Sequence, residues 1–256
     1  MIKAVFFDID GTLVSHNLGT VPEDTREALA RLQEKGIQIF ISSGRHILEL
    51  EQLAMDDIPF DGYVLLNGQV CLDGKREVLC NAAIQEEDIK NVLQVFEERR
   101  LPIGFVEKDR IYANMIDERV RAAQTAVSSP LPPVEEYRGD DVYLVMIFAE
   151  DEACNEVLKQ MPHCKMTRWN SYGVDIVDES GGKVAGMEKM LAIHGIAREE
   201  IMAFGDGEND MEMLEFSGIG VAMGNAEEAV KTCADYVTLD VDSGGIVSAL
   251  EHFGIL

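Results

Sequence analysis

Short, fully apolar runs alternate with helical patterns at both ends of the chain. Ile2–Phe7 is typical of a buried strand, and Pro22–Lys35 is typical of a helix that Gly36 ends. Further strands are predicted at Ile37–Ser42, Tyr63–Leu66, Ile201–Phe204, Gly220–Ala222 and Tyr236–Leu239, and further helices at Ile47–Leu53, Asp210–Phe216, Ala226–Cys233 and from about Gly245. Continuous apolar strands joined by helices indicate an α/β unit whose parallel sheet is covered on both faces.

The middle of the chain has a different pattern. Residues 81–180 begin with a charged helix at Glu86–Arg99 and end with a hairpin formed by Lys165–Arg168 and Val174–Val177. Between them the pattern predicts strands at Ile103–Val106, Ile111–Asn114 and Val142–Phe148, and helices at Glu118–Ala126 and Glu152–Met161. We therefore expect an inserted α+β domain at 81–180, within a core made of residues 1–80 and 181–256.

Charge and cysteine content narrow the classes of partner. The 256 residues carry a formal net charge of −25, which disfavours nucleic acid and anionic membranes as partners. The five cysteines form no C-x-x-C pair, so neither a zinc site nor a disulfide framework is supported. No apolar run is long enough for a membrane span or a signal peptide. We expect a cytoplasmic protein, either a monomer or a homodimer.

Two acidic residues follow the first strand directly. Asp8 and Asp10 stand at i and i+2, so in an extended chain they would point to one side. Like charges held that close need a cation, a shared proton or a substrate to compensate them. An acidic turn is the ordinary alternative, because Asp and Gly are common turn residues.

Three further segments carry polar groups at positions where a parallel sheet places a site. Ser43, Gly44 and Arg45 follow the second strand, where a hydroxyl and backbone amides at a helix start suit a phosphate oxygen. The segment Gly205-Asp-Gly-Glu-Asn-Asp210 follows a later strand and holds a second carboxylate pair. Lys183 stands after two glycines, just past the inserted block. Taken singly, each has a structural explanation: a helix entrance, an acidic helix cap and a surface lysine.

Taken together, the four segments favour phosphoryl transfer. Hard oxygen ligands without His or Cys favour magnesium over zinc. Carboxylates, a magnesium ion, a hydroxyl and a lysine are the groups that phosphoryl transfer uses. The chain has no P-loop and no kinase motif set, so nucleoside triphosphate chemistry is not indicated.

The order of these motifs resembles the haloacid dehalogenase-like hydrolase superfamily, and the insertion resembles its Cof-type branch with a type IIB cap. The resemblance covers nearly the whole chain and implies a Rossmann-like core that hydrolyses small phosphorylated metabolites. It implies that Asp8 is the nucleophile and Asp10 the general acid and base. It further implies that Asp8, the backbone carbonyl of Asp10 and Asp206 bind Mg2+. The phosphoryl oxygens would be bound by Ser43, the Gly44 amide, Lys183 and Asn209. Asp210 and Arg45 would support the site, with Asp210 orienting Lys183 or a metal-bound water.

Specificity is expected to come from the inserted domain. The candidates lie in the turn of its last hairpin (Arg168, Trp169, Asn170 and Tyr172), with Asn67 and Gly68 at a strand end of the core. Trp169 suits stacking on a ring or sugar face, although ordinary packing explains it equally well. Hexose phosphates are the first candidate substrates. A phosphomutase and a phospho-accepting regulatory domain without turnover remain open as alternatives.

Overall fold

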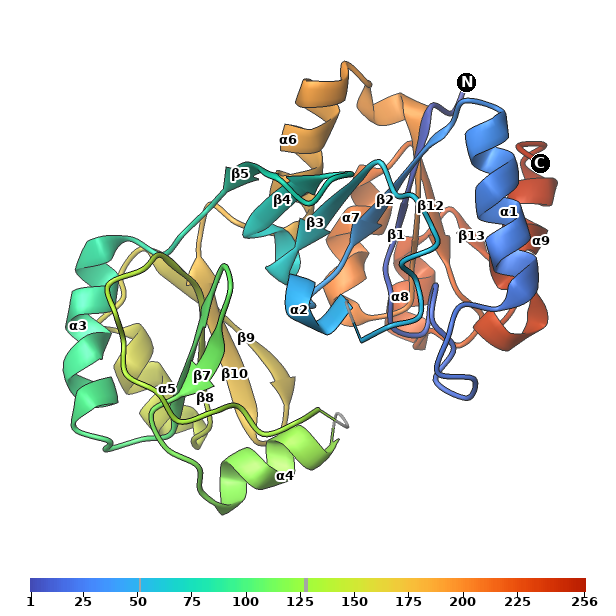
Figure 1. Ribbon diagram of the computed structural model, residues 1–256. Coiled ribbons are helices and arrows are strands. Elements are labelled where there is room, and N and C mark those ends of the chain that lie inside the picture. Colours follow the sequence, from blue (N-terminus) through green and yellow to red (C-terminus); the bar gives the residue numbers. More distant parts are fainter. Residues whose placement is uncertain (51, 127–128) are drawn as a thin grey trace. The chain divides into compact units, whose positions relative to one another are not determined.

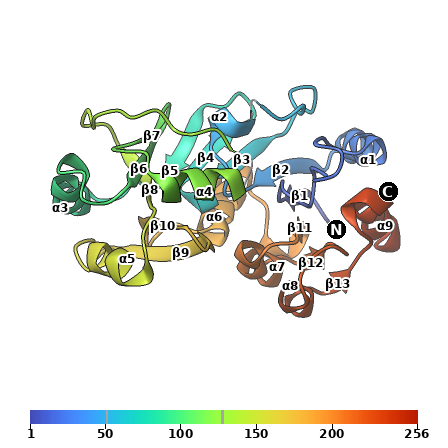
Figure 2. The ribbon, with the colours of Figure 1, turned by 90° about the horizontal axis from the view of Figure 1, so that it is seen from below.

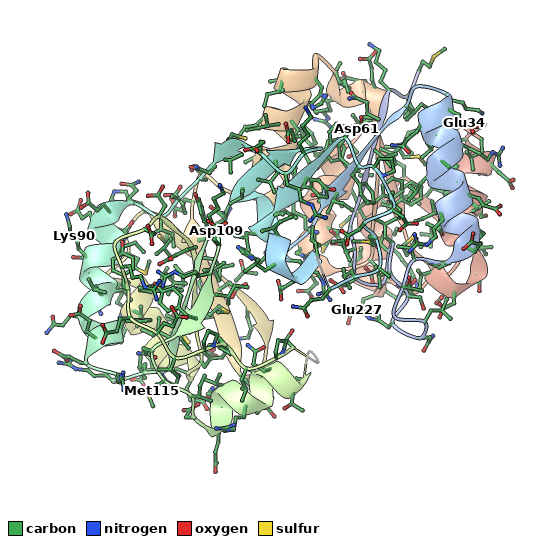
Figure 3. All side chains as sticks on the ribbon, in the orientation of Figure 1. Glu34, Asp61, Lys90, Asp109, Met115 and Glu227 are labelled. Carbon is green, nitrogen blue, oxygen red and sulfur yellow. The ribbon has the colours of Figure 1, made fainter. Side chains whose placement is uncertain are left out.

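A computed structural model describes residues 1–50, 52–126 and 129–256 (Figure 1), together with the backbone but not the side chains of Trp169 and Asn170. The chain forms two compact units. One consists of Met1–Asn81 and Gly182–Leu256, which we call the core unit, and the other of Ala82–Gly181, which we call the cap unit. The side chains drawn in Figure 3 fill the interior of each unit. In the described part of the chain, we find no helix that combines the length and the apolar character needed to cross a membrane.

The core unit is built on an eight-stranded sheet in the order β13-β12-β11-β1-β2-β3-β4-β5. Its strands are β1 (Ala4–Phe7), β2 (Gln38–Ser42), β3 (Gly62–Leu65), β4 (Val70–Asp73), β5 (Val78–Asn81), β11 (Ile201–Gly205), β12 (Ile219–Ala222) and β13 (Tyr236–Val237). The strands from β13 to β3 are parallel, which confirms the predicted α/β class with a parallel-sheet core. The antiparallel pair β4–β5 extends one edge, and the apolar pattern did not predict it.

Helices cover both faces of this sheet (Figure 2). They are α1 (Glu23–Glu34), α2 (Ile47–Leu50), α6 (Lys183–His194), α7 (Met211–Phe216), α8 (Glu228–Cys233) and α9 (Gly245–His252), with short 3-10 turns η1 (Leu66–Gly68), η2 (Arg198–Glu200), η3 (Glu208–Asp210) and η4 (Val241–Ser243). On one face α6, α7 and α8 pack on Phe6, Phe40 and Ala203, and α1 and α9 lie together on the other. The helix predicted at Ile47–Leu53 includes residue 51, which lies outside the described residues; its described part is α2 (Ile47–Leu50).

The strand register brings the candidate motifs to one edge. Phe7, the last residue of β1, is paired with Ile41 of β2 and with Phe204 of β11. The chain therefore leaves these three neighbouring strands at nearly the same level, and Asp8, Ser43 and Asp206 follow within two residues. This alignment is a consequence of parallel pairing, because all carboxyl ends of parallel strands meet at one edge.

The cap unit is a five-stranded antiparallel sheet in the order β7-β6-β8-β10-β9. Its elements are α3 (Glu86–Glu97), β6 (Ile103–Glu107), β7 (Ile111–Ala113), α4 (Glu118–Ala126), β8 (Val142–Ile147), α5 (Asp151–Leu158), β9 (Cys164–Asn170) and β10 (Gly173–Asp178). Phe96 of α3 stacks on Phe105 with ring centroids 4.3 Å apart, and Tyr112 meets both rings edge-on. This aromatic cluster joins α3 to the sheet.

The last hairpin of the cap unit differs from the prediction. We expected Arg168, Trp169 and Asn170 to lie in a turn, but β9 continues through Asn170, which pairs with Gly173. Strand β9 is at the edge of the sheet, where polar residues can extend a strand without breaking its pairing. The connection between β9 and β10 therefore contains only Ser171 and Tyr172.

Candidate active site

Three carboxylates converge where β1 and β11 end. One oxygen from each of Asp8, Asp206 and Asp210 lies within 4.8 Å of the others. Asp210 is fully buried, Asp8 is 6% exposed and Asp206 is half-buried. Three carboxylates at such distances repel one another, so the cluster requires compensating positive charge.

Lys183 supplies part of that charge. Its Nζ donates to Asp8 Oδ1 at 2.7 Å and to Asp210 Oδ1 at 2.6 Å, and the side chain is almost fully buried. Lys183 is the first residue of α6, and the preceding Gly182 has a φ of 146°. A side chain at Gly68 would meet the carbonyl oxygen of Gly182 at 1.9 Å, so the close approach of η1 to this helix start requires glycine.

Burial and mutual repulsion both act on the ionisable groups of this cluster. Burial opposes the charged form of Lys183, but Asp210 and Asp8 outweigh burial and raise its pKa. Burial and then Asp210 raise the pKa of Asp8, and Lys183 offsets only part of that rise. Burial, followed by Asp210, raises the pKa of Asp206 to about 6. Because the donors are hard oxygen atoms, the uncompensated charge fits a magnesium ion.

Asp210 is held by three donors. Its Oδ2 accepts the backbone N–H groups of Asp206 and Gly207, both at 3.0 Å, and its Oδ1 accepts Lys183. Asp210 thus contacts Lys183, one of the two groups that it is predicted to orient, and its role stays a prediction. The ordinary alternative, a side-chain cap of α7, does not apply, because one oxygen of Asp210 binds the preceding turn and the other binds Lys183.

Asp10 lies in a different environment from Asp8. Arg45 donates to it through two nitrogens, Nε to Oδ2 and Nη2 to Oδ1, both at 2.7 Å. Strand β1 ends at Phe7, so the strand alternation that we used to place Asp8 and Asp10 on one side does not extend through them. Two different cations, Lys183 and Arg45, thus hold Asp8 and Asp10, and the supporting role expected of Arg45 stays a prediction.

The predicted phosphate-binding loops meet one another. The backbone N–H of Asn67 donates to the Ser43 carbonyl at 3.0 Å, and Asn209 Nδ2 donates to Asn67 Oδ1 at 3.3 Å. A Cβ at Gly44 would lie 3.3 Å from Asn67 Oδ1. The loops after β2, β3 and β11 therefore bring Ser43, Gly44, Asn67 and Asn209 together.

The cap candidates are described within their own unit. Arg168 is ion-paired with Asp151, and the Tyr172 carbonyl accepts a hydrogen bond from Arg119 Nε at 3.1 Å. The side chains of Trp169 and Asn170 lie outside the described residues. A role of these four residues in specificity stays a prediction.

Two residues near Asp206 were not predicted. Thr12 Oγ1 donates to Asp206 Oδ1 at 3.1 Å, and Asn225 Nδ2 donates to Asp206 Oδ2 at 3.1 Å. Asn225 stands in the segment Met223-Gly-Asn-Ala226, directly after β12. A polar residue just past the end of a buried parallel strand was the signal that could have identified it.

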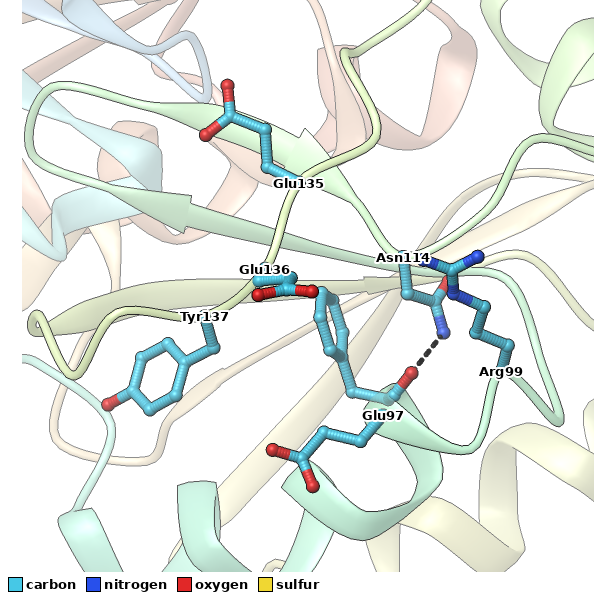
Figure 4. Close-up of a pocket in the computed structure, with 7 residues that line it drawn as sticks. Glu97, Arg99, Asn114, Glu135, Glu136 and Tyr137 are labelled. Atoms are coloured by element: carbon cyan, nitrogen blue, oxygen red, sulfur yellow. Dashed lines mark hydrogen bonds between the residues drawn. The ribbon is translucent and has the colours of Figure 1, made fainter.

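The cap unit contains a cavity of about 280 Å³ (Figure 4). It is lined by Phe96, Glu97, Arg99, Asn114, Glu135, Glu136 and Tyr137. Asn114 Nδ2 donates to the carbonyls of Phe96 and Leu101, both at 2.9 Å, and its Oδ1 accepts the Ile103 amide. These bonds fasten the end of α3 to the sheet, so Asn114 has a structural explanation.

The fold and the carboxylate–lysine cluster define a class of enzyme. The family model described as haloacid dehalogenase-like hydrolase matches residues 5–250, and the chain belongs to this family. This confirms the resemblance drawn from the motifs, and it makes the chain a hydrolase that acts on phosphate esters.

Individual relatives match over nearly the full length. The chain is 31% identical to "Putative phosphatase YkrA" of Bacillus subtilis (strain 168), over 99% of this chain and 98% of that protein. It is 27% identical to the 5-amino-6-(5-phospho-D-ribitylamino)uracil phosphatase YitU of the same organism, over 97% and 96% of the two chains. The structure of the "HAD Subclass IIB Sugar Phosphatase BT4131" matches with a TM-score of 0.84 and 37% identity, covering 99% of this chain and all of that one.

Proposed function

We propose that this chain is a magnesium-dependent phosphatase of small organic phosphate monoesters, with hexose phosphates as the first substrates to test. The observation that carries this proposal is the cluster of Asp8, Asp206 and Asp210, in which the Lys183 ammonium contacts Asp8 and Asp210. The single positive charge of Lys183 does not neutralise three carboxylates, so a divalent cation would complete the charge balance. A carboxylate cluster with a divalent cation and a lysine also suits phosphoryl transfer. The names of two relatives, a sugar phosphatase and a ribitylaminouracil phosphatase, support a phosphorylated metabolite as substrate.

In this proposal the chemistry has two steps. Asp8 attacks phosphorus, so that an Asp8 Oδ–P bond forms and the bond to the leaving oxygen breaks, while Asp10 gives its proton to that oxygen. In the second step Asp10 takes a proton from water, whose oxygen attacks phosphorus and releases Asp8 and inorganic phosphate. In this proposal the cap unit supplies specificity.

The other residues bind and position the reacting groups. Magnesium would be held by Asp8, the backbone carbonyl of Asp10 and Asp206, and it would neutralise charge on the phosphoryl oxygens. Ser43, the Gly44 amide, Lys183 and Asn209 would donate to those oxygens. Asp210 keeps Lys183 charged and in place, as its 2.6 Å contact indicates. Arg45 holds Asp10, so Asp10 must leave this ion pair or share it when it transfers a proton.

Turnover assays test the proposal. Phosphate release from p-nitrophenyl phosphate and from a panel of sugar phosphates is measured with MgCl2 and with EDTA. We expect turnover that needs magnesium and that is lost in Asp8→Asn. The control Asp57→Asn changes an exposed aspartate whose recorded partner is Arg26, and we expect it to leave turnover unchanged.

The same assays separate the alternatives. A phosphomutase would return the phosphoryl group to sugar and produce an isomeric sugar phosphate without net phosphate release. A regulatory domain would keep a long-lived phosphoryl group on Asp8 and release almost no phosphate. Either result would overturn the phosphatase proposal. An unchanged ranking of substrates in Trp169→Ala would contradict a role of Trp169 in specificity.

A further inference from the structure

Asn225 connects three separate loops of the core unit. Its Nδ2 donates to the Gly11 carbonyl at 2.8 Å and to Asp206 Oδ2 at 3.1 Å, and its Oδ1 accepts the Val241 amide at 3.0 Å. These partners lie after β1, after β11 and in η4. Although Asn225 is exposed, these three bonds use both its NH2 group and its oxygen, so they fix the orientation of its side chain.

The bond from Val241 fixes which end of the amide faces the site. A backbone N–H can only donate, so the Asn225 oxygen must face Val241 and the NH2 group must face the other two partners. Both of those partners are oxygen acceptors. The two hydrogens of one NH2 group thus hold the Gly11 carbonyl and the Asp206 carboxylate in a fixed relation.

Asp206 has a second fixed contact. Thr12, which is fully buried, donates to its other oxygen at 3.1 Å. A Cβ at Gly11 would lie 2.2 Å from Asp206 Oδ2, and Gly11 has a φ of +81°. The loop after β1 therefore lies close to Asp206. Asn225, in the loop after β12, donates hydrogen bonds both to that loop and to the Asp206 carboxylate.

We propose that Asn225 is a positioning residue that presents Asp206 to a divalent cation. This inference rests on the proposed magnesium dependence. Groups that hydrogen-bond to a metal-binding carboxylate orient it, and their loss typically lowers metal affinity or activity by about 10- to 100-fold. Because Asn225 is exposed and Thr12 remains, we expect Asn225→Ala to weaken Mg2+ binding by about tenfold, at the low end of this range.

Isothermal titration of Mg2+ in the absence of substrate measures this effect directly. The matched control is Asn17→Ala, because the Asn17 amide fastens the same region of the fold by donating to Asp242 Oδ2, and no contact with Asp206 is recorded for it. We expect the control to keep the wild-type Kd. Unfolding by urea in EDTA gives the stability of each variant without metal, and kcat at rising Mg2+ shows whether activity recovers at saturation.

The outcomes are distinct. Weaker Mg2+ binding in Asn225→Ala alone, with kcat restored at high Mg2+, supports the positioning role. Equal Kd values in wild type and Asn225→Ala overturn it, as does an equal loss in both variants, which would mean that Asn225 only fastens loops. If wild-type protein itself takes up no Mg2+, the proposed function fails first, and this result is separate from the other two.

Discussion

Replacing Asp8 by Asn is expected to stabilise the metal-free fold while it removes the proposed nucleophile. In the native structure Asp8 and Asp210 are buried and share the Lys183 ammonium, and the half-buried Asp206 lies close to both. Active-site groups of this kind commonly lower stability, because their arrangement serves chemistry. The Asn side chain has nearly the same shape, and its oxygen can still accept a hydrogen bond from Lys183.

The magnitude follows from the geometry. At an effective dielectric constant of about 20, each carboxylate within 4.8 Å repels Asp8 by about 3.5 kcal/mol or more, and Lys183 Nζ at 2.7 Å attracts it by about 6 kcal/mol. The repulsion from the two carboxylates and the attraction to Lys183 nearly cancel. The variant then avoids the desolvation cost of a buried charge, which is several kcal/mol. It also loses a charged hydrogen bond, which is worth about 1.5–3 kcal/mol. We expect Asp8→Asn to raise the free energy of unfolding in EDTA by about 1–3 kcal/mol.

The stability that Asp8→Asn gains over wild type should increase as pH rises. The pKa of Asp8 is raised in the folded protein, by burial first and by Asp210 second. Below about pH 4, the ordinary pKa of Asp, the group is protonated in both states and the variant gains nothing. As pH rises above that value the unfolded chain ionises first, which lowers the relative stability of wild type. The advantage of Asp8→Asn should therefore grow with pH until the native group also ionises.

Urea unfolding in EDTA at several pH values measures this difference. The control is Asp61→Asn in the same unit (Figure 3), because Asp61 Oδ2 accepts the Ile39 amide at 2.8 Å and its removal should give no gain. Saturating MgCl2 should remove or reverse the advantage, since the cation would compensate the charge in wild type only. A metal-free Asp8→Asn variant that is less stable than wild type at pH 8 would refute this account of the charge balance.

Two further predictions concern packing. Gly11→Ala should lower the free energy of unfolding by at least about 1 kcal/mol more than Gly19→Ala, since both glycines have positive φ but only at Gly11 would a Cβ meet Asp206; equal losses in urea unfolding would contradict this. Phe105→Ala should destabilise the cap unit by about 3–5 kcal/mol, because the fully buried ring stacks on Phe96. This loss of stability is measured by urea unfolding, followed by the fluorescence of Trp169, the single tryptophan. The control Val134→Ala changes an exposed position and should alter stability by no more than about 0.5 kcal/mol. A comparable change in both variants would argue against the aromatic cluster as the centre of the cap unit.

Most of the parallel core was predictable because strands such as β1, β3 and β11 are fully buried and therefore appear as continuous apolar runs, whereas Val237 of the edge strand β13 is exposed. Asp8, Ser43 and Asp206 could be placed at one edge for the same reason, since each follows such a run. The β4–β5 pair was not predictable in this way. Its second strand alternates half-buried and exposed residues (Val78–Asn81), and the first follows a turn in which Leu66 and Asn67 adopt positive φ.

Contacts between distant residues were beyond what the pattern could show. Asn225 bonds to Gly11 across 214 positions, and neither spacing nor periodicity links them. Likewise, the motif order predicted Arg45 near the site, but it could not show that both carboxylate oxygens of Asp10 accept hydrogen bonds from Arg45. Polar contacts of this kind depend on side-chain directions after folding, whereas apolar periodicity reflects only which face is buried.

The proposed site carries negative formal charge in a protein that is itself strongly acidic, although its proposed substrate is an anion. Four carboxylates (Asp8, Asp10, Asp206 and Asp210) are arranged with two cations, Lys183 and Arg45, so their formal sum is −2. In a protein of net charge −25, this local charge opposes a phosphate dianion. One divalent cation would bring the formal sum to zero. Substrate affinity should therefore be governed by the cation, which accounts for a carboxylate cluster in a site for an anion.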